Sequence, residues 1–478
     1  MSAAVGIAGP SGIAVDAGAA AVSAGGNAVD AAVAATLAAL STEVGIVGLD
    51  AGAFITVWPP GESPVTIDGG IAMPGLEQQA SRFGAAARPV ALDYGGGMQT
   101  LVGYGSVGVG GAVAALGEVA AAWSRLEWPA LVAPAAERVR AGFPLGRASH
   151  TWLRYSHAEI FGWQPESAAV IHDAQGALLP AGAPVHVPGL ADTLLELGRE
   201  GARALYDGRL GAEIATCVQA GGGLLGAADR RAYRAHLRAP LCCELDGWQV
   251  AVPPPPALGG AALAAMLTRL AGRPERDWTP AAVAALAATQ REVFALLAAL
   301  PEIEDADAVL AALRDWARSG GDTGGQHAPS TVHVSTLDED GLACAVTASS
   351  GYGSGVLVPG AGIWLNNCLG ELELNPRGFH ALPPGSRMAS NMSPVTARGP
   401  DGEVLSLGSP GAERITTALL QVLLNFLHRG LSLEDALAAP RLHVERTAEG
   451  WRAAAEPGLP MEAVELPCRH FDGLSMFF

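Results

Sequence analysis

The sequence predicts a mixed α+β protein, and three observations support that prediction. The first 60 residues contain two helical runs of small residues, followed by an apolar run typical of a buried strand. Residues 108–240 and 279–317 have helical spacing and are rich in alanine and leucine. Residues 318–330 are polar and glycine-rich, and two β-rich runs around a glycine-containing turn follow them directly.

Capping signals place the first two helices. The first is expected over Gly12–Ala24, where Gly25 and Gly26 end it. Asn27 suits the cap of the second helix, and Asp30 falls in its first turn, where the helix dipole favours a negative charge. The remaining expected elements are helices over 31–40, 112–123, 192–200 and 415–429, and strands over 53–58, 64–68, 247–252, 363–365 and 404–407.

The glycine-rich stretch 318–330 is the clearest boundary in the chain. It divides a helix-rich part, 1–330, from a β-rich part, 331–478. The runs 331–337 and 342–347 predict a hairpin at the start of the second part.

Composition narrows the class of protein. The chain has 478 residues, of which 50% are hydrophobic and 16% charged, a balance that excludes intrinsic disorder. The net charge is −18, and every basic residue is an arginine. An acidic chain repels a phosphate backbone, and a chain without lysine has neither a Schiff-base lysine nor a P-loop lysine. We therefore expect no nucleic-acid partner.

The apolar stretches do not predict a membrane partner. The run 31–40 is shorter than the roughly 20 residues a bilayer needs, and four successive prolines interrupt the uncharged run 250–268. The six cysteines lack C-x-x-C spacing, so we expect no metal site, and nothing else indicates a cofactor. The N-terminus has no basic segment followed by an apolar one, which predicts a cytoplasmic protein.

A strand that starts directly after a flexible loop suits one catalytic device. If the chain is cut before Thr331, the hydroxyl of this new N-terminus is a nucleophile, and its α-amine, with a pKa of about 7.7–8.0, is a base. The turn Gly408–Ala412 precedes a predicted helix, so its N–H groups can face a developing oxyanion. Both features also have a structural explanation, because threonine favours strands and Gly-Ser-Pro-Gly favours turns. His333 shares the strand face of Thr331, and we expect it to be a hydrogen-bonded structural residue.

Several motifs follow one another along the chain. They are Gly25–Ala32, Trp128–Ala130, Pro253–Gly260, Ser330–Ser335, Leu365–Asn367, Arg387–Pro394 and Gly408–Gly411. In this combination the chain resembles the γ-glutamyltranspeptidase family. The resemblance implies the four-layer α/β/β/α sandwich of N-terminal-nucleophile hydrolases, built by both parts of the chain together. It also implies self-cleavage between Ser330 and Thr331, with the two fragments staying associated.

The resemblance further implies an activity and the residues that carry it. Thr331 would attack the amide carbonyl of a γ-glutamyl or related small-molecule or peptide donor of the glutathione type. Water or an acceptor amine would then take the acyl group. The N–H groups of Gly411 and Ala412 match the family's oxyanion hole. The hydroxyl that orients the nucleophile aligns with Ser349, and Thr347 is the alternative.

The substrate-binding positions depart from the family pattern. Gly70 stands where the family has an arginine that clamps the donor's carboxylate, and no neutral donor reproduces that bidentate geometry. Glu371 replaces the aspartate that binds the donor's amine. Ser390 and Asn391 replace paired serines, and Arg387 precedes them as in the family.

Further departures concern access to the site. Asp50 replaces a glycine and Cys368 replaces a glutamine. The segment 372–387 is short, so we expect an open pocket without a lid loop. Arg82 or Arg88 is the alternative source of a carboxylate clamp.

Three hypotheses follow. The first is a self-processing γ-glutamyltransferase-like amide hydrolase, favoured by the intact junction and the Gly411–Ala412 turn. The second is an uncut, non-catalytic scaffold or small-molecule binder. Gly70, Asn391 and residues 473–478, which resemble the start of a family strand that normally continues, favour it. The third is an acylase for bulky amides such as β-lactam side chains, favoured by the missing clamp and lid.

Overall fold

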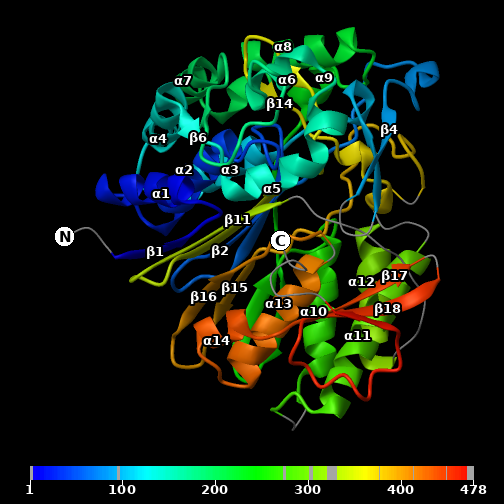
Figure 1. Ribbon diagram of the computed structural model, residues 1–478. Coiled ribbons are helices and arrows are strands. Elements are labelled where there is room, and N and C mark those ends of the chain that lie inside the picture. The colour runs from blue at the N-terminus through cyan, green and yellow to red at the C-terminus, as the bar shows by residue number, and fades with distance from the viewer. Residues whose placement is uncertain are drawn as a thin grey trace.

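Two β-sheets stack against each other in the middle of the molecule, and helices cover both outer faces (Figure 1). The computed structural model describes residues 4–93, 97–272, 276–300, 305–319, 331–375, 377–412, 414–447 and 449–470. The predicted four-layer α/β/β/α sandwich is confirmed.

The first helical layer is built from closely packed small residues. Every residue of α2 (Ala28–Thr42) is buried between its neighbours α1 (Gly12–Ser23) and α4 (Trp128–Ala141) and the first sheet. The predicted cap is confirmed, because the Asn27 side chain accepts from the N–H groups of Val29 and Asp30. The Asp30 carboxylate accepts from the Asn27 N–H at 2.8 Å and completes the capping box.

The first sheet has six antiparallel strands. In spatial order they are β1 (Val5–Ala8), β11 (Val332–Asp338), β12 (Ala343–Ser349), β2 (Gly52–Trp58), β3 (Val65–Gly69) and β8 (His236–Arg238). The structure confirms the predicted strand at 53–58, its partner at 64–68 and the hairpin after residue 330. The edge strand β1 was not predicted from its short, glycine-containing sequence.

The second sheet has four antiparallel strands. They are β16 (Val404–Leu407), β15 (Val395–Arg398), β10 (Trp248–Val252) and β9 (Leu241–Leu245). The two sheets touch through apolar side chains such as Trp58, Ala251 and Ala343. The Thr56 hydroxyl also donates to the carbonyl of Pro394 at 2.9 Å, which links the layers at the point where β15 begins.

A second helical layer covers this sheet (Figure 1). Its helices are α10 (Leu258–Leu270), α11 (Pro280–Ala299), α12 (Ala306–Ser319), α13 (Arg414–Leu423) and α14 (Leu433–Ala438). The helix predicted over 415–429 ends as an α-helix at Leu423 and continues as a π-helical turn, Leu424–His428.

Helix α11 is long and apolar enough to cross a membrane by length and composition. Its packing is that of a core helix, because Val283, Leu286 and Val293 are buried in the second hydrophobic core. The buried Gln290 side chain also bonds to the backbone of β17 (Leu442–Thr447) at Leu442 and Val444.

The remaining elements lie around this frame. They are α3 (Ala112–Trp123), α5 (Arg147–Ser156), α6 (Pro165–Ile171), α7 (Leu190–Glu200), α8 (Arg209–Ala220), α9 (Ala227–Ala232) and the strands β4 (Arg88–Leu92), β5 (Met98–Val102), β6 (Phe143–Pro144), β7 (Pro184–Val185), β13 (Leu357–Val358), β14 (Ile363–Trp364), β18 (Gly450–Ala455) and β19 (Cys468–His470).

The parts of the chain before and after Thr331 are interleaved. In the first sheet, β11 and β12 lie between β1 and β2, so two strands from the second part separate strands of the first. In the second sheet, β15 pairs with β10. Each sheet therefore needs both parts.

Candidate active site

Thr331 is placed at the head of β11, where the described chain resumes after residue 319. Thr331 is 9% exposed and lines a pocket. Ser330 and the rest of the predicted cleavage loop lie outside the described residues.

The pairing of β11 with β12 distinguishes between the two candidate orienting hydroxyls. Val332 faces Ala348 and His333 faces Thr347, so the same register, continued by one pair, places Thr331 opposite Ser349. Ser349 lines the pocket together with Thr331. Thr347 lies one pair deeper, fully buried, and its hydroxyl is 2.9 Å from Nδ1 of His333.

His333 is a partly buried, hydrogen-bonded residue, as predicted. Its two ring nitrogens contact the hydroxyls of Thr347 at 2.9 Å and Ser335 at 2.7 Å. Burial lowers the pKa of His333 to about 3, so the ring is neutral at physiological pH. The ring also lies against the turn at Gly408, where an added Cβ would be 2.1 Å from Cε1 and Nδ1. Gly408 therefore allows the turn before α13 to approach β11.

The turn before α13 contains two residues with positive φ. Gly411 has φ 131° and Ala412 has φ 49°, and their carbonyls accept from the N–H groups of Arg414 and Ile415. Within the described residues no acceptor bonds the N–H of Gly411 or of Ala412. Ala412 lines the same pocket as Thr331. Unpaired N–H groups at a helix N-terminus are suited to a developing negative charge.

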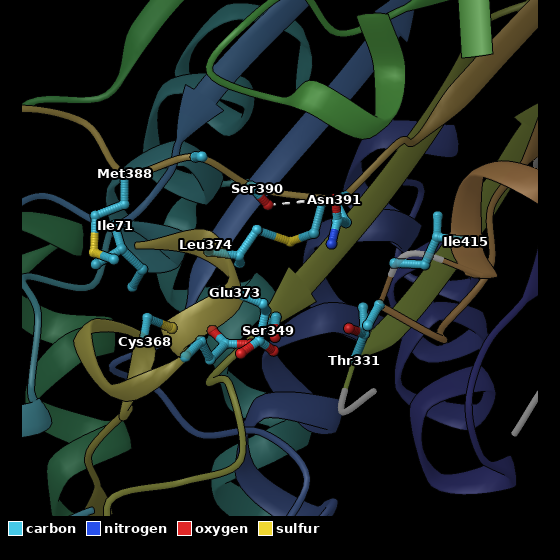
Figure 2. Close-up of a pocket in the computed structure, with 14 residues that line it drawn as sticks. Ile71, Thr331, Ser349, Cys368, Glu373, Leu374, Met388, Ser390, Asn391 and Ile415 are labelled. Carbon is cyan, nitrogen blue, oxygen red and sulfur yellow. Dashed lines mark hydrogen bonds between the residues drawn. The ribbon is translucent and has the colours of Figure 1, made fainter. Parts of the chain in front are cut away.

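The pocket has about 560 Å³ of empty space, including the solvent at its mouth. Thr331 and Ile415 lie at one end, Ser349 and Glu373 lie between, and Ile71, Met388 and Cys368 lie at the other end (Figure 2). The other lining residues are Glu371, Leu374, Ala389, Ser390, Asn391, Met392 and Ala412.

Two carboxyl groups lie in the pocket wall. Glu371 is 9% exposed, and burial together with the neighbouring Glu373 carboxylate raises its pKa to about 8. The thiol of Cys368 beside it partly offsets this rise in the pKa of Glu371. Glu373 accepts from the hydroxyl of Tyr352 at 2.8 Å. The wall is thus acidic and poorly solvated.

Ser390 and Asn391 are positioned by the proline run and the start of α10. The N–H of Ser390 donates to the carbonyl of Pro256 at 2.9 Å, and the Ser390 hydroxyl accepts from the N–H of Met392. An added Cβ at Gly259 would be 2.1 Å from the carbonyl oxygen of Asn391. The glycine therefore lets α10 approach this edge of the pocket.

The model of the family described as gamma-glutamyltranspeptidase matches residues 14–300 and 298–466. The chain belongs to the γ-glutamyltranspeptidase family. A glutathione hydrolase proenzyme from Pseudomonas aeruginosa is 30% identical over 446 residues, covering 85% of this chain and 76% of the relative. The Acylase ACY 1 proenzyme of Pseudomonas sp. (strain V22) is 28% identical over 384 residues, covering 73% of this chain and 66% of the relative, just under two thirds of its length.

Solved structures share the fold of this family member. A cephalosporin acylase from Bacillus halodurans has a TM-score of 0.80 at 24% identity, covering 100% of this chain and 91% of the acylase chain. A γ-glutamyltranspeptidase from Helicobacter pylori has a TM-score of 0.53 at 20% identity, covering 64% of this chain and 90% of that one. At these identities the likeness shows the fold.

In this γ-glutamyltranspeptidase family member, Gly70 stands where the family pattern has the carboxylate-clamping arginine. A Cβ added at Gly70 would be 3.0 Å from the Asp68 carboxylate and 3.2 Å from the Phe54 ring, so a long side chain has no free path there. Arg387 contacts Asp68 at 3.5 Å and lies over the ring of Tyr233 at 4.2 Å. Neither Gly70 nor Arg387 lines the pocket.

Arg82 and Arg88, the two alternative candidates for binding a donor carboxylate, also lie outside the pocket lining. Arg88 forms an ion pair with Glu159 at 4.0 Å and lies over the ring of Trp163. Arg82 is exposed in a short 3-10 turn. The pocket-lining residues include neither of them.

One buried ion pair near the site was not predicted. Arg230 and Asp50 are both fully buried and in direct contact. The side-chain amide of Asn366 donates to the other oxygen of Asp50 at 3.0 Å. Arg230 also lies over the ring of Tyr206, which stacks on Tyr233. Asp50 was the residue from which this ion pair could have been predicted, because a carboxylate in a buried, glycine-rich loop requires a partner.

Among the described residues, no group of three or more His, Cys, Asp or Glu side chains could hold a metal ion.

Proposed function

We propose that this chain is a self-processing amide hydrolase or acyltransferase whose nucleophile is Thr331. Cleavage between Ser330 and Thr331 would free the α-amine that the chemistry needs, since an amide nitrogen in the intact chain is not a base. The freed hydroxyl would then attack the amide carbonyl of a small-molecule or peptide donor.

One observation carries this proposal. Thr331, Ser349 and Ala412 come from three segments of the chain and meet at one pocket. They supply a nucleophile, an orienting hydroxyl and an oxyanion donor, which are the groups that acyl transfer requires. A threonine that merely starts a strand has no need of the other two.

The steps follow from these positions. The α-amine of Thr331 takes the hydroxyl proton as Oγ1 bonds to the carbonyl carbon, and Gly411 and Ala412 hold the resulting oxyanion. The proton passes to the leaving amine as the amide C–N bond breaks, which leaves an ester on Thr331. Water hydrolyses this ester, or an acceptor amine takes the acyl group, and the hydroxyl is restored.

The relatives support the same class of reaction. The family includes proteins named as glutathione hydrolases and acylases, and several of these names denote proenzymes. We infer that this chain also matures from a precursor into two associated fragments. These names are compatible with a γ-glutamyl donor and with other acyl donors.

Intact-mass spectrometry after incubation at neutral pH tests the proposal. We expect two fragments, divided between Ser330 and Thr331, from the native sequence and from Thr331→Ser, which keeps a hydroxyl. Thr331→Ala should stay uncut. A native chain that stays whole over days, or that is cut equally well in Thr331→Ala, would overturn the proposal in favour of a binding protein.

A further inference from the structure

We propose that the pocket selects amide donors whose acyl chain carries an amine and no carboxylate. This inference rests on the proposed function of Thr331 and names its substrate class. Three features of the pocket carry it, namely the absence of a cation from its lining, a buried carboxyl group, and an apolar wall.

The first feature is the lack of a positive side chain. The described pocket-lining residues include no arginine or histidine, and the whole sequence has no lysine. Arg387, the neighbour of Met388 in the wall, is held by Asp68 and the ring of Tyr233. Arg377 follows the acidic segment but is exposed and does not line the pocket. A donor carboxylate would therefore be desolvated there without an ionic partner, which is strongly unfavourable.

The second feature is the position of Glu371. Glu371 is 9% exposed in the wall, and the thiol of Cys368 beside it is a weak hydrogen-bond donor. The neighbouring Glu373 repels its charged form. A donor ammonium would relieve that repulsion and supply the missing partner.

The third feature is the apolar wall. Ile71 and Met388 lie at the end of the pocket away from Thr331, and Leu374 and Met392 continue the wall (Figure 2). Methylene groups of an acyl chain fit such a surface. A chain with its carbonyl at Thr331 and an amine at Glu371 uses all three features.

A panel of four p-nitroanilides that differ only in the acyl chain tests this. Butyryl carries neither group, 4-aminobutyryl carries the amine, glutaryl carries the carboxylate, and γ-glutamyl carries both. We expect 4-aminobutyryl to have the highest kcat/KM and γ-glutamyl to be at least about tenfold lower. Glutaryl should fall below butyryl. A γ-glutamyl or glutaryl donor that equals or exceeds 4-aminobutyryl would overturn the inference.

The variant Glu371→Gln gives a sharper readout. We expect it to lower the ratio of kcat/KM for 4-aminobutyryl to kcat/KM for butyryl towards one. Cys368→Ala keeps the carboxyl and removes its thiol neighbour, so it should retain the preference for the amine. A Glu371→Gln enzyme with an unchanged preference would contradict the assignment.

The ratio of 4-aminobutyryl to butyryl turnover should also depend on pH. The groups that shift the pKa of Glu371 are Glu373 and Cys368. Because both donors use the same nucleophile, titration of the α-amine cancels in the ratio. The ratio should rise with pH as Glu371 loses its proton, by up to about tenfold per pH unit, and then level off. In Glu371→Gln it should be flat.

Failure of the inference differs from failure of the proposed function. An enzyme that is cut at Thr331 and prefers γ-glutamyl keeps the function and loses the inference. A chain that is neither cut nor active on any of the four donors loses both.

Discussion

The contact between His333 and Gly408 joins β11, which follows Thr331, to the turn before α13. A Cβ at position 408 would collide with the imidazole at 2.1 Å, so the two backbones hold their spacing through this ring. We expect Gly408→Ala to lower the free energy of unfolding by about 1–3 kcal/mol and to reduce kcat, because the turn must move.

A double-mutant cycle checks the cause. His333→Ala removes the ring, so the added methyl of Gly408→Ala should cost less in that background. Urea unfolding of the four proteins gives the coupling energy. Additive effects of the two changes would show that the contact is not what constrains the turn.

The register of Thr331 against Ser349 predicts different effects for the two neighbouring hydroxyls. Ser349→Ala should lower kcat by about 10–100-fold with little loss of stability, because the proposed role of its hydroxyl is to orient Thr331 at the pocket. Thr347→Val should chiefly cost stability, by about 1 kcal/mol, because it leaves a buried nitrogen of His333 without its partner. Steady-state kinetics on cut enzyme and urea unfolding separate these outcomes, and a reversed pattern would assign the role to Thr347.

At the scale of single elements, α2 shows how local chemistry fixes a boundary. The Asn27 side chain accepts from two N–H groups and donates to the Trp123 carbonyl at 2.7 Å. We expect Asn27→Ala to lower the free energy of unfolding by about 1–2 kcal/mol, and Asn27→Asp, which keeps the accepting oxygen, to cost less. Chemical denaturation measures both. Equal losses for the two variants would mean that the bond to Trp123 dominates.

Local signals explain which elements were predictable. The cap at Asn27, the alanine-rich run 112–123 and the apolar strand 53–58 determine their own conformation, and each appears as expected. The strand β1 depends on pairing with β11, more than 300 positions away in the chain, and its four residues carry no periodic signal of their own. The π-helical turn after α13 also has no local signal.

The candidate site divides in the same way. Thr331 and the Gly411–Ala412 turn stood out because a flexible junction and a glycine turn have strong sequence signatures. Two other features depend on how distant segments pack. Glu371 and Glu373 line the same pocket, and Arg387 forms an ion pair with Asp68. Spacing along the chain does not encode these contacts.

At the scale of the whole molecule, one buried histidine, His443, and one partly buried histidine, His333, make stability depend on pH. Burial lowers the pKa values of His333 and His443 from 6.5 to about 3. Since the unfolded chain binds these protons near pH 6.5 and the folded protein near pH 3, this stability is full above pH 6.5. It falls as the pH drops towards 3, by up to about 1.4 kcal/mol per pH unit for each histidine.

Glu371 acts in the opposite direction at higher pH. Its folded pKa of about 8 exceeds the ordinary 4.5, so the folded state holds an extra proton between these values and gains stability as the pH falls from 8 to 4.5. Below about pH 4.5 the histidine effect is no longer opposed. Urea midpoints should therefore fall steeply between pH 4.5 and pH 3, and less so in a His333→Gln, His443→Gln double variant. An equal fall in that variant would place the acid sensitivity elsewhere.

The interleaved sheets predict how a cut chain behaves. Because β11 and β12 lie between strands of the first part, separation of the fragments would break the hydrogen bonds on both sides of that pair. We expect the two fragments to co-elute in size-exclusion chromatography and to separate only in denaturant. Separation under native conditions would contradict the shared sheets.

The same interleaving sets an order of events for the protein's synthesis. A ribosome that released residues 1–330 as an independent product would leave β1 and β2 without the strands that lie between them, and exposed strand edges promote aggregation. We therefore expect the uncut chain to keep the second part attached to the first until both sheets have formed. Genes that encode the two parts separately should therefore yield insoluble product, whereas one continuous reading frame yields a folded protein that can afterwards be divided.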